Sequence, residues 1–204
     1  MIDKFDKEKI ISEVKKLQYL YRLKQEIRYN CVRPTLDLTE SVAEHVYGMQ
    51  ILALYFLPLE NPTGDWDRAK IFEMITIHDI DEVETGDMLG YQKTPEIRAK
   101  EANAMKIVID NSPEHLKAHW MELVNEYEAL TSPEAKFVKA IDRFEPLIHL
   151  YTAHGREILK KNHTTRNQSQ GLKYPYVKDF PYMSKFTYAI DEVMTEEGYW
   201  CDED

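Results

Sequence analysis

Two histidines and two aspartates have types and positions that suit a single divalent metal ion. His78 and Asp79 are neighbours, His45 lies well before them, and Asp142 lies well after them. Two imidazoles and two carboxylates form a mixed nitrogen and oxygen ligand set that suits Mn, Co, Fe, Ni, Zn or Mg. A bound cation of this kind lowers the pKa of water and polarises a phosphoryl oxygen. The four residues therefore predict one divalent metal ion and hydrolysis of a phosphate ester.

Each of these residues also has an ordinary explanation. His45 or His78, taken singly, could be a core histidine with one hydrogen-bond partner. Asp142 belongs to the most apolar segment of the chain, where an unpaired carboxylate would be costly to bury. A salt bridge with Lys139 or Arg143, or a position facing water, would also satisfy it. The metal hypothesis is favoured because all four residues are expected on inward helix faces or at a helix edge.

Helices are the elements expected to position these side chains. Apolar residues recur at helical spacing, and only seven glycines in 204 residues argue against sandwich and barrel folds. An amphipathic helix is expected over residues 6–26. The next helix should begin at Ser41, which can form a capping box with Glu44 and would place His45 inward. The fold class predicted is all-α, a single helical bundle.

The remaining helix starts are marked by capping residues. A helix is expected from about Asp65 into the acidic segment HDIDEVETGD (78–87), with His78 on its apolar face. Three later starts share a capping residue followed by Pro and Glu, at Thr94, Ser112 and Ser132. The helix after Ser132 should carry Asp142 on a stripe beside the buried positions Phe137, Ile141, Phe144, Ile148 and Tyr151.

The C-terminal quarter is expected to be less regular. Residues 162–181 are polar and predict a loop, and a last helix is expected from about Met183 to Glu196, before an acidic tail. No repeat or linker divides the chain. One domain over residues 1–204 is predicted, with its core at about 20–160 and the loop, helix and tail at 162–204.

Composition narrows the classes of partner. The net charge of −10 argues against a nucleic acid polymer, because no basic stripe is available to release counterions. The two cysteines, Cys31 and Cys201, have no CxxC spacing, which fits a reduced, cytoplasmic protein. The charged N-terminus is unlike a signal peptide, and the longest apolar run, residues 51–57, is too short to span a bilayer. No membrane association is expected.

The segments that carry these residues resemble a known family. They read ESVAEH (40–45), HDIDEVETGD (78–87) and PEAKFVKAID (133–142), with Arg28 ahead of them. This order resembles the HD-domain phosphohydrolases, and within them the 5′-deoxynucleotidases of the HD domain-containing protein 2 type, over about residues 20–155. The resemblance implies hydrolysis of deoxyribonucleoside 5′-monophosphates to nucleoside and phosphate by a metal-dependent homodimer.

The resemblance also implies roles for further residues. Glu82 corresponds to a glutamate that assists proton transfer, Asp87 to an acid that contacts the sugar 3′-hydroxyl, and Arg28 to an arginine that holds the phosphate. Tyr29 and Cys31 stand at the two positions where the family carries a tryptophan of the sugar pocket, so Tyr29 is expected to contact substrate and the choice between deoxyribose and ribose stays open. Lys139 is expected to touch phosphate or to stabilise the ligand carboxylate. The other acids of the segment, Asp81 and Glu84, are expected to be solvated.

Other readings of the same residues stay open. The substrate could be a different small phosphate ester, or the chain could be a non-catalytic module that holds a ligand at its HD site. A diiron oxygenase would need further histidine ligands, and His115 and His119 are instead expected on a charged helix surface. His149 is expected at the boundary of the core.

Overall fold

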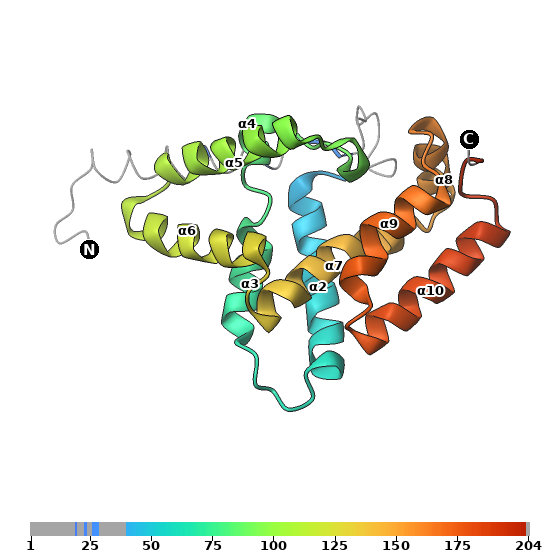
Figure 1. Ribbon diagram of the computed structural model, residues 1–204, viewed down its shortest axis with the longest axis horizontal. Coiled ribbons are helices and arrows are strands. Elements are labelled where there is room, and N and C mark those ends of the chain that lie inside the picture. The colour runs from blue at the N-terminus through green and yellow to red at the C-terminus, as the bar shows by residue number, and fades with distance from the viewer. Residues whose placement is uncertain (1–18, 20–22, 24–25, 29–39, 203–204) are drawn as a thin grey trace.

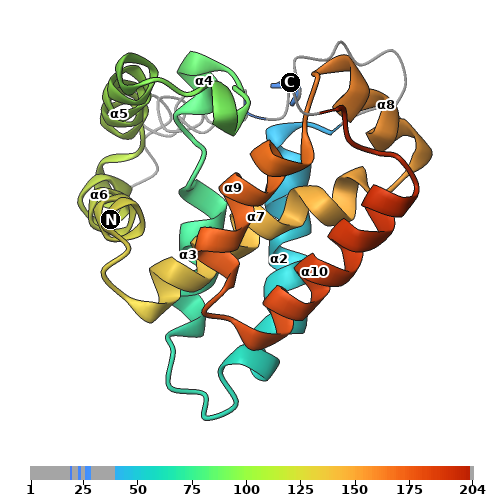
Figure 2. The same ribbon diagram turned by 45° about the vertical axis from the view of Figure 1, so that its right-hand side comes forward.

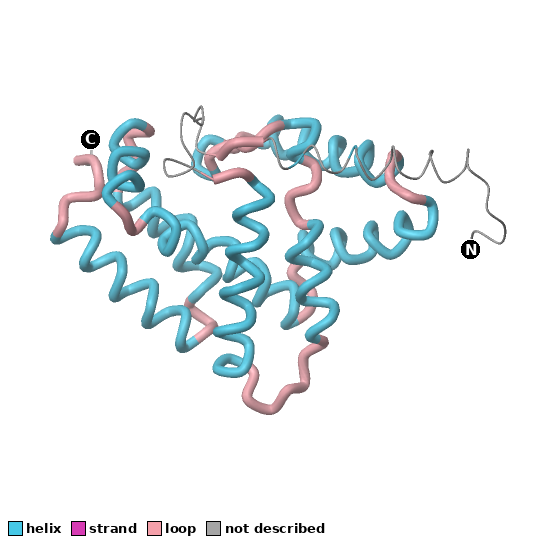
Figure 3. Tube along the Cα trace, turned by 180° about the vertical axis from the view of Figure 1, so that it is seen from behind, coloured by secondary structure: helices cyan, strands magenta, loops and turns pink. Residues whose placement is uncertain are grey.

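The computed structural model describes residues 19, 23, 26–28 and 40–202, and these residues form a helical bundle without a strand. Figure 3 shows helices joined by short loops throughout this part of the chain. The all-α prediction is confirmed. The helix expected over residues 6–26 lies almost entirely outside the described residues, as do Tyr29 and Cys31, and the extent of one domain over residues 1–204 stays a prediction.

Helix α7 (Pro133–Leu150) is the centre of the bundle. It packs against α2 (Val42–Glu60), α3 (Arg68–Ile77) and α6 (Glu114–Ala129) on one side, and against α9 (Arg166–Val177) and α10 (Pro181–Glu196) on the other. Figure 2 shows α7 crossing behind α9, between α3 and α10. Because α7 carries Asp142, this central position brings the aspartate to the helices that carry the histidines.

Large aromatic side chains hold the bundle together around α7. Phe144 packs edge-to-face on Phe56 of α2 with ring centroids 5.3 Å apart, and Phe137 packs against Trp66 at 5.4 Å. Burial of such rings removes a large apolar area from water and stabilises the fold. At the far end of α7, Ile148 and Tyr151 are 43% and 42% exposed, so their predicted burial was wrong. The buried side there is formed by Leu147 and Leu150 instead.

Several helix starts follow the expected capping chemistry. The capping box of Ser41 and Glu44 is formed, with the Ser41 side chain accepting from Glu44 N and the Glu44 carboxylate accepting from Ser41 N at 2.7 Å. Thr94 caps α5 (Pro95–Asp110) and Ser132 caps α7. Ser112 does not cap α6, because its hydroxyl donates to Val108 O at 2.8 Å at the end of α5.

The C-terminal region differs most from expectation. Residues 162–181 were predicted to form a loop, but Arg166–Val177 form helix α9, with a second capping box between Thr165 and Gln168. Three polar side chains of α9 bind the buried Asp191 of α10, namely Arg166, Gln170 and Tyr174. The polar composition therefore reflects a helix that is joined to its neighbour through hydrogen bonds. A short helix, α8 (Ala153–Lys161), precedes it.

Two ends of the molecule extend from this centre. Figure 1 shows α5 and α6 projecting to one side and α8, α9 and α10 lying on the other. Among the described helices, only α2 is long and apolar enough to cross a membrane. The apolar run at residues 51–57 is part of this longer helix. Its inner face, with Met49, Ala53 and Phe56, is buried in the core, and a core helix meets the same criterion.

Candidate metal centre and active site

The four predicted ligand side chains converge at the middle of the bundle. His45 Nε2 lies 3.7 Å from Asp142 Oδ1 and 4.0 Å from Asp79 Oδ2. His78 Nε2 lies 3.0 Å from Asp79 Oδ2 and 4.0 Å from Asp142 Oδ1. Ligand atoms bound to one ion at about 2.1 Å are separated by roughly 3 to 4 Å, so these spacings suit a shared metal.

The local structure explains how segments so far apart in sequence meet. His45 occupies an inward position near the start of α2, and His78 is the residue at which α3 ends. Asp79 follows in the turn between α3 and the short helix α4 (Glu82–Thr85), and Asp142 comes from the middle of α7. The helix expected from about Asp65 ends where the acidic segment begins, because the chain turns after His78 and starts a separate short helix at Glu82. That turn directs Asp79 back toward the two imidazoles.

Each imidazole is oriented by a hydrogen bond at its other nitrogen. His78 Nδ1 lies 2.9 Å from the backbone oxygen of Ile75, and His45 Nδ1 lies 2.7 Å from Glu145 Oε2. A donor bond from Nδ1 leaves the lone pair on Nε2, which is the arrangement of histidine ligands in metal sites. The sequence did not single out Glu145 as part of the site, although it lies one helical turn after Asp142.

The Nε2 atoms of His45 and His78 are the observation that best fits a metal ion. Both are fully buried and make no hydrogen bond among the described residues, because the nearest groups are carboxylate oxygens, which accept hydrogen bonds and cannot donate to an unprotonated nitrogen. A buried polar atom without a partner costs about 1–3 kcal/mol, so such atoms call for an explanation. A divalent cation bound by His45, His78, Asp79 and Asp142 would satisfy both nitrogens.

Asp142 divides its two oxygens between different neighbours. Oδ1 faces the histidines, whereas Oδ2 accepts from the Tyr127 hydroxyl at 3.0 Å and lies 3.5 Å from Lys139 Nζ and 3.7 Å from Arg143 Nε. Although burial raises the pKa of Asp142, Arg143 and Lys139 hold it well below its usual range. Asp142 can therefore pair with Lys139 and Arg143 through Oδ2 and still offer Oδ1 to a metal ion.

Glu82 lies beside this group with a carboxyl suited to carry a proton. It is only 5% exposed, and its Oε2 has no hydrogen-bond partner among the described residues. Burial raises the pKa of Glu82 well above its usual value, and the charges of Asp79 and Asp87 raise it further. A protonated carboxyl in this position can act as a general acid.

The remaining acids of the segment behave differently from one another. Asp81 was expected to be solvated, but it is buried, and burial together with Asp79 raises its pKa to about 7. The reason is the turn after His78, which points Asp81 toward Lys93 and α5. Glu84 is exposed, as expected, and accepts from the Tyr19 hydroxyl at 2.8 Å.

Arg28 is surrounded by carboxylates. Its Nη1 lies 2.5 Å from Glu40 Oε1 and 3.4 Å from Glu145 Oε2, and its Nε lies 3.8 Å from Asp87 Oδ1. Ligand atoms of His45, His78 and Asp79 lie within 4.8 Å of one another, with Asp142 close to both histidines, and Glu40, His45 and Glu145 form a second such group. The guanidinium of Arg28 already supplies a positive charge to this group, which favours the first group as the metal site.

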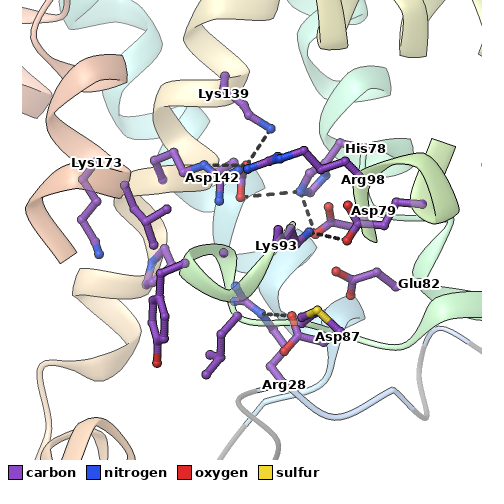
Figure 4. A pocket seen from close by; sticks show the side chains of 18 of the residues that line it. Arg28, His78, Asp79, Glu82, Asp87, Lys93, Arg98, Lys139, Asp142 and Lys173 are labelled. Atoms are coloured by element: carbon purple, nitrogen blue, oxygen red, sulfur yellow. Dashed lines mark ion pairs between the residues drawn. The ribbon is translucent and has the colours of Figure 1, made fainter. Parts of the chain in front are cut away.

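A cavity of about 450 Å³ lies beside these residues, and one side of it is lined by Arg28, His78, Asp79, Glu82, Asp87 and Asp142. Figure 4 shows Asp79, Glu82 and Asp87 on one side of Asp142, Lys173 on the opposite side and Lys139 above it. Lys93 also lines it and is paired with Glu101 at 2.7 Å. A cavity of this volume accommodates a small organic phosphate.

Three other histidines lie away from the cavity. His115 is exposed, and His119 is 53% exposed and lies 2.6 Å from Glu73, so neither forms a second metal site with this group. His149 Nδ1 lies 3.4 Å from Glu40 Oε2, at the boundary of the core. The expected surface positions of His115 and His119 and the expected boundary position of His149 agree with the structure.

Comparison with known proteins identifies the family. A model of the HD domain matches residues 20–183, which include all four candidate ligands. The chain belongs to the HD domain family. A solved structure of a predicted metal-dependent phosphohydrolase from Magnetospirillum magnetotacticum has the same fold as this HD protein, with a TM-score of 0.78 at 21% identity over 95% of this chain and 98% of that one.

Sequence relatives of this HD protein carry a more specific name. It is 31% identical over 136 residues to the 5′-deoxynucleotidase HDDC2 of Mus musculus, covering 65% of each chain. It is 30% identical over 153 residues to the 5′-deoxynucleotidase hdd1 of Schizosaccharomyces pombe, covering 70% of this chain and 73% of that one. The match thus spans slightly less than two thirds of the mouse protein's own length.

Proposed function

We propose that this chain is a metal-dependent phosphomonoesterase that hydrolyses (deoxy)ribonucleoside 5′-monophosphates to nucleoside and phosphate. The observation that carries the proposal is the pair of buried Nε2 atoms, on His45 and His78, that face two carboxylates. His78 and both carboxylates line the cavity. The sequence relatives named 5′-deoxynucleotidase support a nucleotide as the substrate.

The residues divide the work of hydrolysis between them. His45, His78, Asp79 and Asp142 would hold one divalent ion, which would supply Lewis-acid activation of the phosphoryl group and of water. Glu82 donates its proton to the ester oxygen as the P–O bond breaks, so that the nucleoside leaves as a neutral alcohol. Asp87, at the rim, is suited to accept a hydrogen bond from a sugar hydroxyl.

The cations of the cavity compensate the charge of the phosphate. Lys139 donates to the Tyr127 hydroxyl at 3.0 Å and lies beside Asp142, within reach of a phosphate bound there. Arg28, held by Glu40 and Glu145, is pre-positioned with its guanidinium at the cavity wall. A guanidinium matches two phosphate oxygens. A substrate-binding role for Tyr29 also belongs to this proposal, although that residue lies outside the described part of the chain.

Phosphate release tests the proposed activity. The purified protein is incubated with the four deoxyribonucleoside 5′-monophosphates, their ribose counterparts and several sugar phosphates, with Mn²⁺, Co²⁺ or Mg²⁺ or with a chelator. We expect metal-dependent release that is fastest from deoxyribonucleotides and absent with the chelator. Equal rates with sugar phosphates would reduce the assignment to a general phosphohydrolase, and no release from any compound would contradict it.

We also propose that the protein is a cytoplasmic homodimer that associates through the outer faces of α2 and α10. Tyr47, Ile51, Leu54 and Tyr55 form one apolar stripe on α2 and are each 47% to 65% exposed. The stripe continues onto α10, where Phe186 contacts Tyr55 with ring centroids 5.9 Å apart. Apolar patches of this kind commonly mark self-association surfaces.

Light scattering during gel filtration tests the dimer. The parent protein should elute with the mass of two chains, and Ile51→Glu combined with Leu54→Glu should convert it to a monomer, because charges would be buried at the interface. Ile107→Glu, at a similarly exposed position on α5, is the control and should remain dimeric. A monomeric parent would refute the proposal.

A further inference from the structure

Lys173 of α9 is a cation for which the proposed hydrolysis has no use. It lines the cavity on the side away from Asp79 and Glu82, as Figure 4 shows. Its Nζ donates to Ser169 Oγ at 2.8 Å and approaches Ser169 O at 3.5 Å. Among the described residues, no carboxylate lies within ion-pair distance of this amine. Asp191 attracts it from further away, but the carboxylate of Asp191 is already bound by Arg166.

Arg143 lines the same cavity and places a second positive charge close enough to Lys173 to affect its pKa. It comes from α7, against which α9 packs, and its Nε is buried without a hydrogen-bond partner among the described residues. Burial and, to a smaller extent, the positive charge of Arg143 lower the pKa of Lys173 to about 8. Two neighbouring cations at a partly buried cavity wall repel each other, and an anion between them would relieve that cost.

Lys173 differs from the other cations on this wall in its surroundings. Lys139 and Arg143 both lie within 3.7 Å of Asp142 Oδ2, so each already has a carboxylate beside it. Lys173 lines the same cavity, and its amine contacts only the oxygens of Ser169 among the described residues. A buried cation with only neutral partners is stabilised by a bound anion.

A hydroxyl completes the surroundings of Lys173. Ser169 is buried and lines the cavity, and its oxygen accepts from Lys173, which leaves its own proton available to an anion. Ammonium, guanidinium and hydroxyl donors in one corner are the usual composition of a carboxylate or phosphate subsite.

We propose that Lys173 and Arg143, with Ser169, bind a second anionic group of the substrate, a carboxylate or a phosphate located away from the reacting phosphomonoester. This inference rests on the proposed phosphomonoesterase activity and specifies the class of substrate. The preferred substrates are phosphomonoesters with an additional negative charge, and Lys173 is the residue that discriminates them from simple monophosphates.

Matched substrate pairs test the subsite. Uridine 5′-monophosphate and orotidine 5′-monophosphate differ by one carboxylate on the base, and deoxyadenosine 5′-monophosphate and 3′,5′-bisphosphate differ by one phosphate. In the parent, kcat/KM should be higher for the more anionic member of at least one pair, and which pair responds distinguishes carboxylate from phosphate. The ratio of kcat/KM for the more anionic member of a pair to kcat/KM for the less anionic member should fall by about 10- to 100-fold in Lys173→Met, as for the loss of one charge-assisted hydrogen bond. Lys173→Arg should restore most of it.

The controls separate this inference from the proposed function. Lys178→Met removes an exposed lysine from the C-terminal end of the same helix and should leave both ratios unchanged. Calorimetric binding of the same four nucleotides in the presence of a chelator reads the subsite without catalysis. If no nucleotide is hydrolysed but binding still follows the Lys173 pattern, the proposed function fails and the subsite stands. Equal ratios for parent and Lys173→Met in both assays would overturn the subsite.

Discussion

Glu82→Gln is expected to lower kcat by about 10²- to 10⁴-fold, the usual contribution of a general acid, with little change in bound metal. Glutamine has nearly the same volume as the buried glutamate but carries no transferable proton. The leaving oxygen would then depart as an unprotonated alkoxide, which raises the barrier. Phosphate release at saturating nucleotide measures the effect.

Glu84→Gln is the matched control for this change. Glu84 lies on the same short helix, α4, but is exposed and faces Tyr19 rather than the cavity. Its substitution should leave kcat within about twofold, as for most surface changes. A full rate in Glu82→Gln would show that the proton comes from another group.

Asp142→Asn is expected to lower kcat/KM by at least about 10³-fold at a fixed, limiting metal concentration. The amide is nearly isosteric and can still accept a hydrogen bond from Tyr127, but it lacks the negative charge that attracts a cation. Lys139 and Arg143 would also lose their counter-charge and repel the metal. Phosphate release across a Mn²⁺ titration measures the change.

The exposed Lys136 on the same helix offers a comparison for Asp142. Lys136→Gln should titrate with Mn²⁺ as the parent does, because this residue lies on the solvent side of α7. If phosphate release by Asp142→Asn depended on Mn²⁺ concentration as it does in the parent, Asp142 would not be a metal ligand. Its role would then be to hold Tyr127 and Lys139 in place.

The convergence of the four proposed metal ligands could be predicted because their chemistry conflicts with their surroundings. Asp142 in a strongly apolar helix, and histidines at inward positions of two other helices, need a common partner to be stable when buried. Their convergence follows once α7 is central. The caps formed by Ser41, Thr94 and Ser132 were predictable for a different reason, since capping depends only on nearby residues, whereas Ser112 binds the end of the preceding helix instead.

Features that depend on distant contacts were not predictable in this way. Glu145 orients His45 across the space between α7 and α2, and nothing in its local sequence separates it from an ordinary helix residue. Helix α9 was mistaken for a loop because its polar residues bind Asp191 of α10, a contact between segments that only folding brings together. Asp81 was placed in solvent because the helix was expected to continue beyond His78.

The position of a bound Mn²⁺ ion in a crystal of the protein tests the central claim most directly. We predict one anomalous-scattering peak at about 2.0–2.3 Å from His45 Nε2, His78 Nε2 and a carboxylate oxygen of each of Asp79 and Asp142. A peak on the other side of the His45 ring, between Nδ1, Glu40 and Glu145, would contradict this assignment, and so would the absence of any peak near His78.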